Sequence, residues 1–382
     1  MRFRPIVADP EVSVTEFSHI EPHTHSHRFG LLILTLCLLA LPLTPLMAKN
    51  TDKDNHGKPD KDDEEEDTLI EIYDDGSNGS GGECTAVGDW NATSKTCTLT
   101  RDVDASIQIT DPNNTQTGVT LDGDGHRVNL PVSGSVKVLG YHHNLKDLNI
   151  LGAIVADEPT GIGVSLYDAY YVTVSDVDVA NTRTGVALEY TMNSVISDST
   201  FSGVYFGVYL YGLYYEYSCV EAEVPYLHYC GASSNVLENN SFTSFSGSGY
   251  GIYLAQAARE NIIRGNTVSA FDYGIYLPDW SCGYTLTDYD YCQTGNIVYQ
   301  NNLIDNHVDD NPSAKTQIYA DWGKTTTIFN LDAPDGGNYY SDFDVPEEGC
   351  VDANEDGFCD SPYYGHYATD YLPWTSMDGW LP

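Results

Sequence analysis

A short apolar phrase that opens with glycine recurs along the chain at intervals of about 22 residues, one of which is twice as long as the rest. A fixed period in this range is the signature of a repeat fold, in which each repeat buries its apolar face only against its neighbours. The phrases are Gly163-Val164-Ser165-Leu166, Gly185-Val186-Ala187-Leu188, Gly207-Val208-Tyr209-Leu210, Gly251-Ile252-Tyr253-Leu254 and Gly274-Ile275-Tyr276-Leu277.

The spacing within each repeat is that of β-strands. Apolar residues alternate in each phrase, as they do along a half-buried strand. Two further apolar segments follow each phrase, for example Val195-Ile196 and then Phe201 after the phrase at Gly185. Three short strands per repeat, with no segment of helix length between them, predict an all-β chain folded as a right-handed parallel β-helix of about seven to nine coils. Neighbouring coils in such a stack lie roughly 4.8 Å apart.

Asparagines at one turn position predict how the buried turns are satisfied. Asn240, Asn266 and Asn301 stand at equivalent places in three coils. We expect them to form an internal amide ladder, in which each side chain bonds the backbone of the next coil. The alternative is the ordinary preference of asparagine for turns.

The start of the chain, before the repeats, has a different composition. Residues 1–48 end in an apolar run and are predicted to be a secretory signal peptide. Their long, partly acidic start is unusual for such a signal, so an uncleaved membrane anchor is the alternative. Residues 49–82 are acidic and of low complexity, and we expect a disordered linker. The parallel β-helix is then expected over residues 83–345, followed by a C-terminal cap over residues 346–382.

The charge balance limits the partners. Lys and Arg number 17 against 56 Asp and Glu, which gives a formal net charge of −39. This argues against nucleic acid and against anionic membrane surfaces, so no membrane insertion is expected once the signal is removed. It also disfavours free polyanionic glycans unless calcium bridges them.

Eight of the nine cysteines fall into four pairs. The two members of each pair stand close together in the sequence, and none of the pairs has the C-x2-C spacing typical of a zinc site. We therefore expect four local disulfides, which place the protein in an oxidising compartment, either secreted or in the periplasm or at the cell surface. The expected bridges are Cys84–Cys97, Cys219–Cys230, Cys282–Cys292 and Cys350–Cys359.

Two insertions rich in aromatic residues interrupt the period. Each follows a Gly-Val/Ile-Tyr-Leu phrase and contains one cysteine pair. Equal positions of a repeat share one side of the stack, so the two loops are expected to form the walls of a groove. Tyrosine and tryptophan suit the faces of sugar rings, although they also suit packing against each other. The candidate ligand-binding residues are Tyr215, Tyr217, Tyr226, Tyr229, Trp280, Tyr284, Tyr289 and Tyr291.

Catalysis in this groove is an alternative to binding alone. In β-helix polysaccharide lyases an arginine or lysine abstracts the proton next to a uronate, with acidic groups or calcium nearby. By this analogy the candidate catalytic residues are Arg259, Arg264, Asp279, Asp288 and Asp290. The simpler interpretation is that these are solvated or paired surface charges.

An acidic segment near the C-terminus predicts a structural Ca²⁺ site. Asp352, Asn354, Asp356 and Asp360 occupy positions 1, 3, 5 and 9 of an EF-hand-type loop, and the Phe358 carbonyl would supply position 7. Position 12 lacks the usual glutamate, so a nearby aspartate, at position 342 or 344, is expected to complete the shell. The alternative is an ordinary acidic turn.

The C-terminal segment resembles the terminal signature of NosD-like β-helix proteins, whose repeats are shared with carbohydrate-binding and sugar-hydrolysing proteins. The resemblance covers about residues 100–375 and rests on the repeats and on three phrases. It implies a periplasmic role in copper delivery to nitrous oxide reductase, for which His142 and His143 would be the residues to test. The phrases are Gly337-Asn338-Tyr339-Tyr340-Ser341-Asp342-Phe343, Asp360-Ser361-Pro362-Tyr363 and Asp370-Tyr371-Leu372-Pro373.

Three functions follow from these patterns. The first is a secreted, calcium-stabilised β-helix that binds carbohydrate or another extended extracellular polymer between the two loops. The second is a polysaccharide lyase or glycosidase acting in the same groove. The third is a periplasmic accessory of metallocentre assembly of the NosD type.

Overall fold

The computed structural model describes residues 68–77, 81–112, 116–212, 231–255, 258–278, 295–307, 317–320 and 326–382. All of them belong to one compact unit, Glu64–Pro382. The predicted signal peptide and most of the predicted linker lie outside the described residues and stay predictions. Within the described ranges, no helix is both long enough and apolar enough to cross a membrane.

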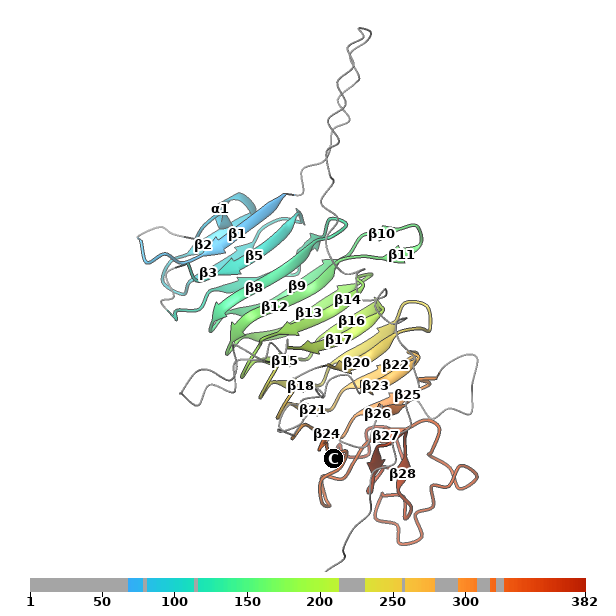
Figure 1. Ribbon diagram of the computed structural model, residues 1–382. Coiled ribbons are helices and arrows are strands. Elements are labelled where there is room, and N and C mark those ends of the chain that lie inside the picture. Colours follow the sequence, from blue (N-terminus) through green and yellow to red (C-terminus); the bar gives the residue numbers. More distant parts are fainter. Residues whose placement is uncertain are drawn as a thin grey trace, which may run out of the picture. The chain divides into compact units, whose positions relative to one another are not determined.

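The described strands stack into a right-handed parallel β-helix, as predicted (Figure 1). A nine-stranded sheet, here called sheet A, contributes one strand per coil, and all its pairings are parallel. Its strands, in spatial order, are β1 (Leu69–Tyr73), β5 (Ser106–Thr110), β8 (Ser135–Tyr141), β12 (Ile162–Tyr170), β14 (Thr184–Glu189), β17 (Phe206–Tyr211), β20 (Tyr250–Leu254), β23 (Tyr273–Leu277) and β26 (Ile318–Ala320).

A second sheet of sixteen strands, here called sheet B, supplies the other sides of the coils. It is parallel except for the first hairpin, β2–β3. In most coils two short strands, separated by a turn, follow the strand of sheet A. The strands are β2 (Gly88–Asn91), β3 (Thr96–Leu99), β4 (Val103–Asp104), β6 (Thr120–Asp122), β7 (Arg127–Asn129), β9 (Asn144–Leu151), β13 (Thr173–Ala180), β15 (Val195–Ser197), β16 (Thr200–Val204), β18 (Val236–Glu238), β19 (Ser241–Ser244), β21 (Ile262–Arg264), β22 (Thr267–Ser269), β24 (Ile297–Tyr299), β25 (Asn302–Ile304) and β27 (Tyr339–Tyr340).

The recurring glycine exists because the walls of the β-helix meet closely at that position. The phrases pair in register, with Val186 opposite Val208 and Val208 opposite Ile252. A Cβ on Gly251 would lie 2.1 Å from Cγ1 of Val268 and 2.6 Å from the carbonyl oxygen of the next phrase glycine. No side chain fits there, so glycine is kept from coil to coil.

The first coil begins earlier than the sequence predicted. The linker predicted through residue 82 is wrong for residues 69–73, which form β1 and pair in register with β5. The reason is the alternation in Leu69–Tyr73, where Ile70 and Ile72 enter the core. The Glu83 carboxylate accepts the Glu71 N–H, and the Glu83 N–H donates to the Glu71 carbonyl. These contacts, made just before the short helix α1 (Cys84–Val87), cover part of the open strand edge.

The predicted asparagine ladder is confirmed and is longer than expected. The Asn266 side chain accepts from the backbone N–H of Asn240, and that of Asn301 accepts from the N–H of Asn266, each at 3.0 Å. The ladder continues to Asn338, whose own N–H donates to the buried carboxylate of Asp370 at 2.7 Å. A second ladder through Asn235, Asn261 and Asn296 runs along another corner of the coils.

Two of the four predicted disulfides lie in the described residues, and both are present. Cys84–Cys97 joins α1 to β3 with Cα atoms 5.7 Å apart, and Cys350–Cys359 closes a loop of the C-terminal segment with Cα atoms 4.8 Å apart. The other two predicted bridges, Cys219–Cys230 and Cys282–Cys292, lie outside the described residues.

The C-terminal segment packs on the last coil through Tyr340 and Tyr363, whose rings stack at 3.8 Å. Tyr363 belongs to the hairpin β28 (Tyr363–Tyr364) and β29 (Thr369–Asp370).

Candidate binding surface

Tyrosines form a row along the outer face of sheet A. In the phrase Gly-Ile-Tyr-Leu the apolar residues point into the core, so the tyrosine between them points outward. Tyr209, Tyr253, Tyr276 and Tyr319 occupy one register position in four successive coils. Their ring centroids are 5.2, 5.3 and 5.6 Å apart. His366 extends the row, because its ring stacks on Tyr319 at 4.2 Å.

A second aromatic row runs beside the first. Phe206, Tyr250 and Tyr273 pair in register, and their stacked rings are 5.3 and 5.4 Å apart. The two rows touch, since the rings of Tyr250 and Tyr276 lie 4.9 Å apart. Together the rows make a surface, here called the aromatic stripe, that crosses the coils along the axis of the β-helix. It consists of Phe206, Tyr209, Tyr250, Tyr253, Tyr273, Tyr276, Tyr319 and His366.

The aromatic side chains of the stripe are neither fully buried nor fully exposed to solvent. Its tyrosines are partly exposed, apart from Tyr253, which is 8% exposed. Burial raises the pKa of Tyr209 to about 12, with smaller contributions from Tyr211 and Glu189. The hydroxyl therefore stays protonated at neutral pH and can donate a hydrogen bond. The stripe can thus offer flat apolar ring faces together with neutral polar tips.

The aromatic contacts continue beyond sheet A into the C-terminal hairpin. The ring of Tyr367 meets that of His366 edge-on at 4.4 Å. Tyr367 and Tyr371 are 62% and 64% exposed and line a pocket of about 380 Å³. The other lining residues are Thr327, Ile328, Phe329, Asn330, Ala368 and Thr369.

The segments predicted to form the two loops follow β17 and β23 in the sequence, and β20 lies between these two strands in sheet A. The predicted ligand-binding residues, Tyr215 to Tyr229 and Trp280 to Tyr291, lie outside the described residues and stay predictions. The sequence interpretation missed the stripe itself. Its signal was present in the alternation of the Gly-Ile-Tyr-Leu phrase, which fixes the outward direction of the tyrosine.

The candidate catalytic arginine Arg264 is engaged in an ion pair. Its guanidinium donates to the Glu238 carboxylate at 2.6 and 3.0 Å and to the Tyr299 hydroxyl at 3.3 Å. These bonds, first to Tyr299 and then to Glu238, raise the pKa of Arg264 above its ordinary value, which is unfavourable for a general base. Arg264 also ends β21, a strand of sheet B, whereas the segments predicted to form the loops follow strands of sheet A in the sequence. Its predicted partners Asp279, Asp288 and Asp290 lie outside the described residues.

Arg259 and the histidine pair occupy different environments. Arg259 stands in the turn between β20 and β21, in the coil that separates the two loops. His142 is exposed and stacks on Tyr171 at 5.0 Å. His143 is fully buried, its Nδ1 accepts the Val119 N–H at 3.0 Å, and burial lowers its pKa to about 4. Both histidines lie in the turn between β8 and β9, where His142 has a φ of +60°, so His143 enters the core and His142 stays on the surface.

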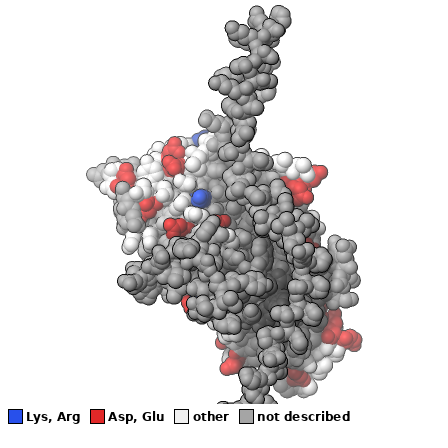
Figure 2. All heavy atoms as spheres, viewed as in Figure 1, with Lys and Arg blue, Asp and Glu red and all other residues white. Residues whose placement is uncertain are grey.

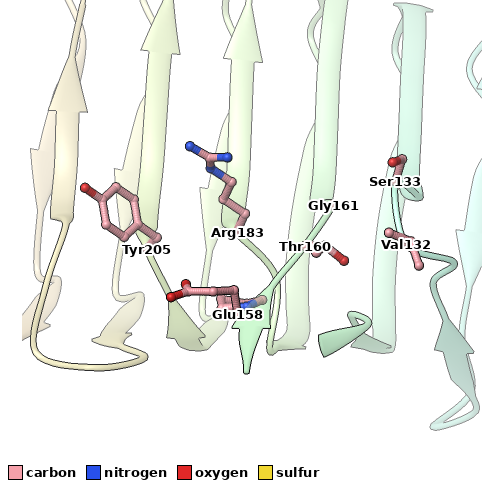
Figure 3. A pocket seen from close by; sticks show the side chains of 8 residues that line it. Val132, Ser133, Glu158, Thr160, Gly161, Arg183 and Tyr205 are labelled. Carbon is pink, nitrogen blue, oxygen red and sulfur yellow. The ribbon is translucent and has the colours of Figure 1, made fainter. Parts of the chain in front are cut away.

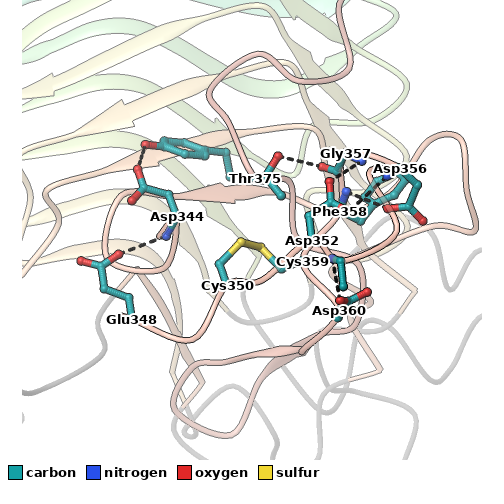
Figure 4. Close-up of a disulfide and its surroundings, with 12 residues drawn as sticks. Asp344, Glu348, Cys350, Asp352, Asp356, Gly357, Phe358, Cys359, Asp360 and Thr375 are labelled. Atoms are coloured by element: carbon teal, nitrogen blue, oxygen red, sulfur yellow. Dashed lines mark hydrogen bonds between the residues drawn. A yellow bond between two sulfur atoms is a disulfide. The ribbon is translucent and has the colours of Figure 1, made fainter. Parts of the chain in front are cut away.

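The acidic C-terminal loop is folded around its own carboxylates (Figure 4). Asp352 accepts the backbone N–H groups of Asp356 at 3.1 Å and Gly357 at 2.9 Å. The Asp360 carboxylate accepts the Ala353 N–H at 2.9 Å, and the Asn354 amide donates to Asp356 at 3.0 Å. Among the described residues, no group of three or more His, Cys, Asp or Glu side chains converges as a metal site.

The aspartates expected to complete the calcium shell have hydroxyl partners. Asp342 accepts the Tyr363 hydroxyl at 3.2 Å, and Asp344 accepts the Tyr339 hydroxyl. On the face of the molecule in Figure 2, the described residues show several acidic side chains and few basic ones. Four of the basic side chains, Lys95, Lys146, Arg264 and His126, contact carboxylates.

The comparisons with known proteins agree with this architecture. A family model described as "Periplasmic copper-binding protein (NosD)" matches residues 113–345, which is more than half of the chain. A search of curated proteins gives no match. The disulfides fit the extracytoplasmic location that this family name states. With a parallel β-helix over the matched residues, the chain belongs to the NosD family of periplasmic β-helix proteins.

Proposed function

We propose that this extracytoplasmic protein binds an extended carbohydrate polymer along the aromatic stripe. The observation that carries the proposal is the alignment of aromatic rings in register over four coils of sheet A. Such a surface repeats at the spacing of the coils and therefore suits a ligand that is itself long and repetitive. A polymer lying along the axis would meet the same kind of contact at each coil.

The chemistry of the rings favours sugars over other extended ligands. Tyrosine pairs a flat apolar face with a hydroxyl, and a sugar ring pairs a patch of C–H groups with hydroxyls. The acidic surface disfavours nucleic acid and other strong polyanions. The exposed Tyr367, which contacts His366, and the exposed Tyr371, which lines the same pocket as Tyr367, supply further surfaces of the same type.

Binding measurements on single tyrosine variants test this proposal. Tyr276→Ala should weaken binding of a glycan oligomer, identified on an array with calcium present, by roughly 5- to 30-fold, because a lost aromatic contact costs about 1–2 kcal/mol. Tyr171→Ala is the matched control, since Tyr171 is 50% exposed but lies outside the stripe. Equal affinities of both variants and the wild type would show that the stripe only packs against the protein.

We also propose that the loop from Asp352 to Asp360 binds a structural Ca²⁺. The support is the spacing of its oxygen-bearing side chains and the disulfide that closes the loop. Asp352, Asn354, Asp356 and Asp360, with the Phe358 carbonyl, would hold the ion. Terbium luminescence titration tests this: the wild type should bind the ion and Asp352→Asn should not. Asp178→Asn, at an exposed site on β13, should behave as the wild type.

The family match favours one alternative, a periplasmic accessory of copper metallocentre assembly. Of the two histidines, only His142 is exposed to an incoming ion, because His143 is buried in the first coils. Titration with Cu(I) and Cu(II) separates the alternatives. Stoichiometric binding that His142→Ala abolishes would favour the copper role, whereas an unchanged stoichiometry in that variant would exclude His142 from it.

A further inference from the structure

One row of residues runs along the edge of sheet A, immediately before its strands. Gly134, Gly161, Arg183, Tyr205 and Gly249 occupy this position in five successive coils. The backbone carbonyl of each of these residues accepts a hydrogen bond from the N–H of the first residue in the next strand of sheet A, at 2.9 to 3.3 Å. The row therefore contains three glycines and, next to each other in the stack, two residues with large side chains, Arg183 and Tyr205.

The glycines leave a hollow beside Arg183 and Tyr205. Gly161 has a φ of +73°, and a Cβ there would lie 2.7 Å from the Gly134 carbonyl oxygen, so a side chain is excluded by both conformation and space. The hollow is a pocket of about 620 Å³, within the usual range for small-molecule sites. Its lining residues are Val132, Ser133, Glu158, Pro159, Thr160, Gly161, Arg183 and Tyr205 (Figure 3).

A small hairpin builds one wall of the pocket. Strands β10 (Ile154–Val155) and β11 (Glu158–Pro159) project from the coil that precedes β12 (Figure 1). The Thr160 hydroxyl fixes the base of this hairpin by donating to the Ala153 carbonyl at 2.8 Å. The hairpin places the Glu158 carboxylate and the Pro159 ring beside the row. The wall is thus an ordered part of the fold.

Arg183 differs from the paired cations of this acidic protein. Its side chain is exposed and forms no hydrogen bond or ion pair with the residues that the structure describes. By contrast, Lys95, Lys146 and Arg264 each contact a carboxylate at 2.6 Å. The planar guanidinium matches a carboxylate through two parallel hydrogen bonds. Arg183 is therefore placed to recognise an anionic group of a ligand.

The remaining lining groups suit a ligand that carries hydroxyls. Ser133, Thr160 and Tyr205 provide hydroxyl oxygens, Glu158 provides a carboxylate acceptor, and Val132 provides an apolar surface. The ring of Tyr205 also meets Phe206 at 5.0 Å and Tyr250 at 6.1 Å, and both of these belong to the stripe. The pocket is therefore continuous with the surface that we propose for the polymer.

We propose that this pocket binds an acidic sugar residue of that polymer, with the sugar carboxylate on the Arg183 guanidinium. This inference rests on the proposed function, because the stripe holds the chain from which the acidic residue enters the pocket. The net charge of −39 repels polyanions over the surface as a whole. A single cation in a pocket walled by the hairpin would overcome this repulsion locally, so binding would select polymers with acidic residues at this one site.

A comparison of free uronic acids with their methyl esters tests the inference. The probes are otherwise neutral oligosaccharides of matched length that carry one galacturonic or glucuronic acid residue, each as the acid and as the uncharged methyl ester, together with the fully neutral oligosaccharides. For the preferred sugar, we expect the wild type to bind the acid at least about 10-fold more tightly than the ester, the loss typical of one charge-assisted hydrogen-bond pair. Arg183→Gln should remove this preference, and Arg183→Lys should restore part of it.

Arg264→Gln is the matched control, because Arg264 is a surface arginine on sheet B, and it should keep the preference. No preference in the wild type, or an equal preference in Arg183→Gln, would overturn the inference. Binding of neutral oligosaccharides that depends on Tyr276 would then leave the proposed function standing. An acid preference that depends on Arg183 but not on Tyr276 would refute the role of the stripe alone, and no binding of any glycan would refute both.

Discussion

Removal of one amide from the asparagine ladder should destabilise the β-helix more than its size suggests. Asn266 is fully buried, and its side chain makes five hydrogen bonds of 2.9 to 3.0 Å. It accepts from the backbone and the amide of Asn240, and it donates to Asn301 and to the carbonyls of Leu237 and Arg264. The substitution Asn266→Ala removes all five and leaves polar groups on both neighbouring coils without this partner.

The cost can be estimated from the groups that lose their partner. A buried donor or acceptor left unsatisfied costs about 1–3 kcal/mol. In Asn266→Ala the backbone N–H of Asn240 loses its acceptor and the Leu237 carbonyl loses its donor. We therefore expect a loss of about 3–5 kcal/mol, since these costs are only partly additive. Asn144→Ala is the matched control, because the Asn144 amide is partly buried and donates one side-chain bond at 3.4 Å.

Urea unfolding followed by circular dichroism and tryptophan fluorescence provides the assay. The urea midpoint of Asn266→Ala should fall strongly. The free energy of unfolding of Asn144→Ala should differ from that of the wild type by less than about 1 kcal/mol. Hydrogen exchange should show lost protection at the Asn240 amide. If both variants were equally stable, the ladder would contribute no more than an ordinary turn, and the physical argument for it would be refuted.

Two further predictions concern the end of the ladder and the glycine phrases. Burial raises the pKa of Asp370 from 3.8 to about 7, so its contribution to stability is full below about pH 4 and is lost as the pH rises through 7. At pH 8, Asp370→Asn should be more stable than the wild type by at most about 4 kcal/mol in thermal unfolding, and the difference should vanish at pH 4, whereas a constant difference would contradict this pKa. Gly251→Ala should cost at least about 2 kcal/mol because its Cβ would meet the neighbouring strand. Gly247→Ala, where the Cβ meets no atom within 4 Å but φ is +76°, should cost about 1 kcal/mol, and equal costs would refute the packing argument.

The sequence determines the fold of this chain because the repeat is both periodic and local. The glycine phrases, the alternation and the asparagines predicted the parallel β-helix, the number of coils and the first ladder. The start of the first coil was missed, because the acidic composition around Leu69–Tyr73 concealed a short alternating strand. An isolated strand of this length can be recognised in the sequence only when its pairing partner, Ser106–Thr110, is known.

The candidate site was less predictable than the fold. The sequence interpretation concentrated on the inserted loops, whereas the stripe depends on which side chains face outward from sheet A. The pocket at Arg183 depends on residues from four successive coils, brought together by the register and by a hairpin. Its signal in the sequence was the pair of glycines, at 134 and 161, one coil apart in the stack. Spacing alone does not show that such glycines leave room for a ligand.

The most direct test of the account is oxidative footprinting of the tyrosines with and without a bound glycan oligomer. Mass spectrometry measures the rate of hydroxyl-radical modification of each residue in the two states. The account predicts slower modification of Tyr276, Tyr319 and Tyr367 in the presence of the oligomer, and unchanged modification of Tyr171. Protection confined to residues outside the stripe, with Tyr276 and Tyr319 unaffected, would contradict the proposed binding surface.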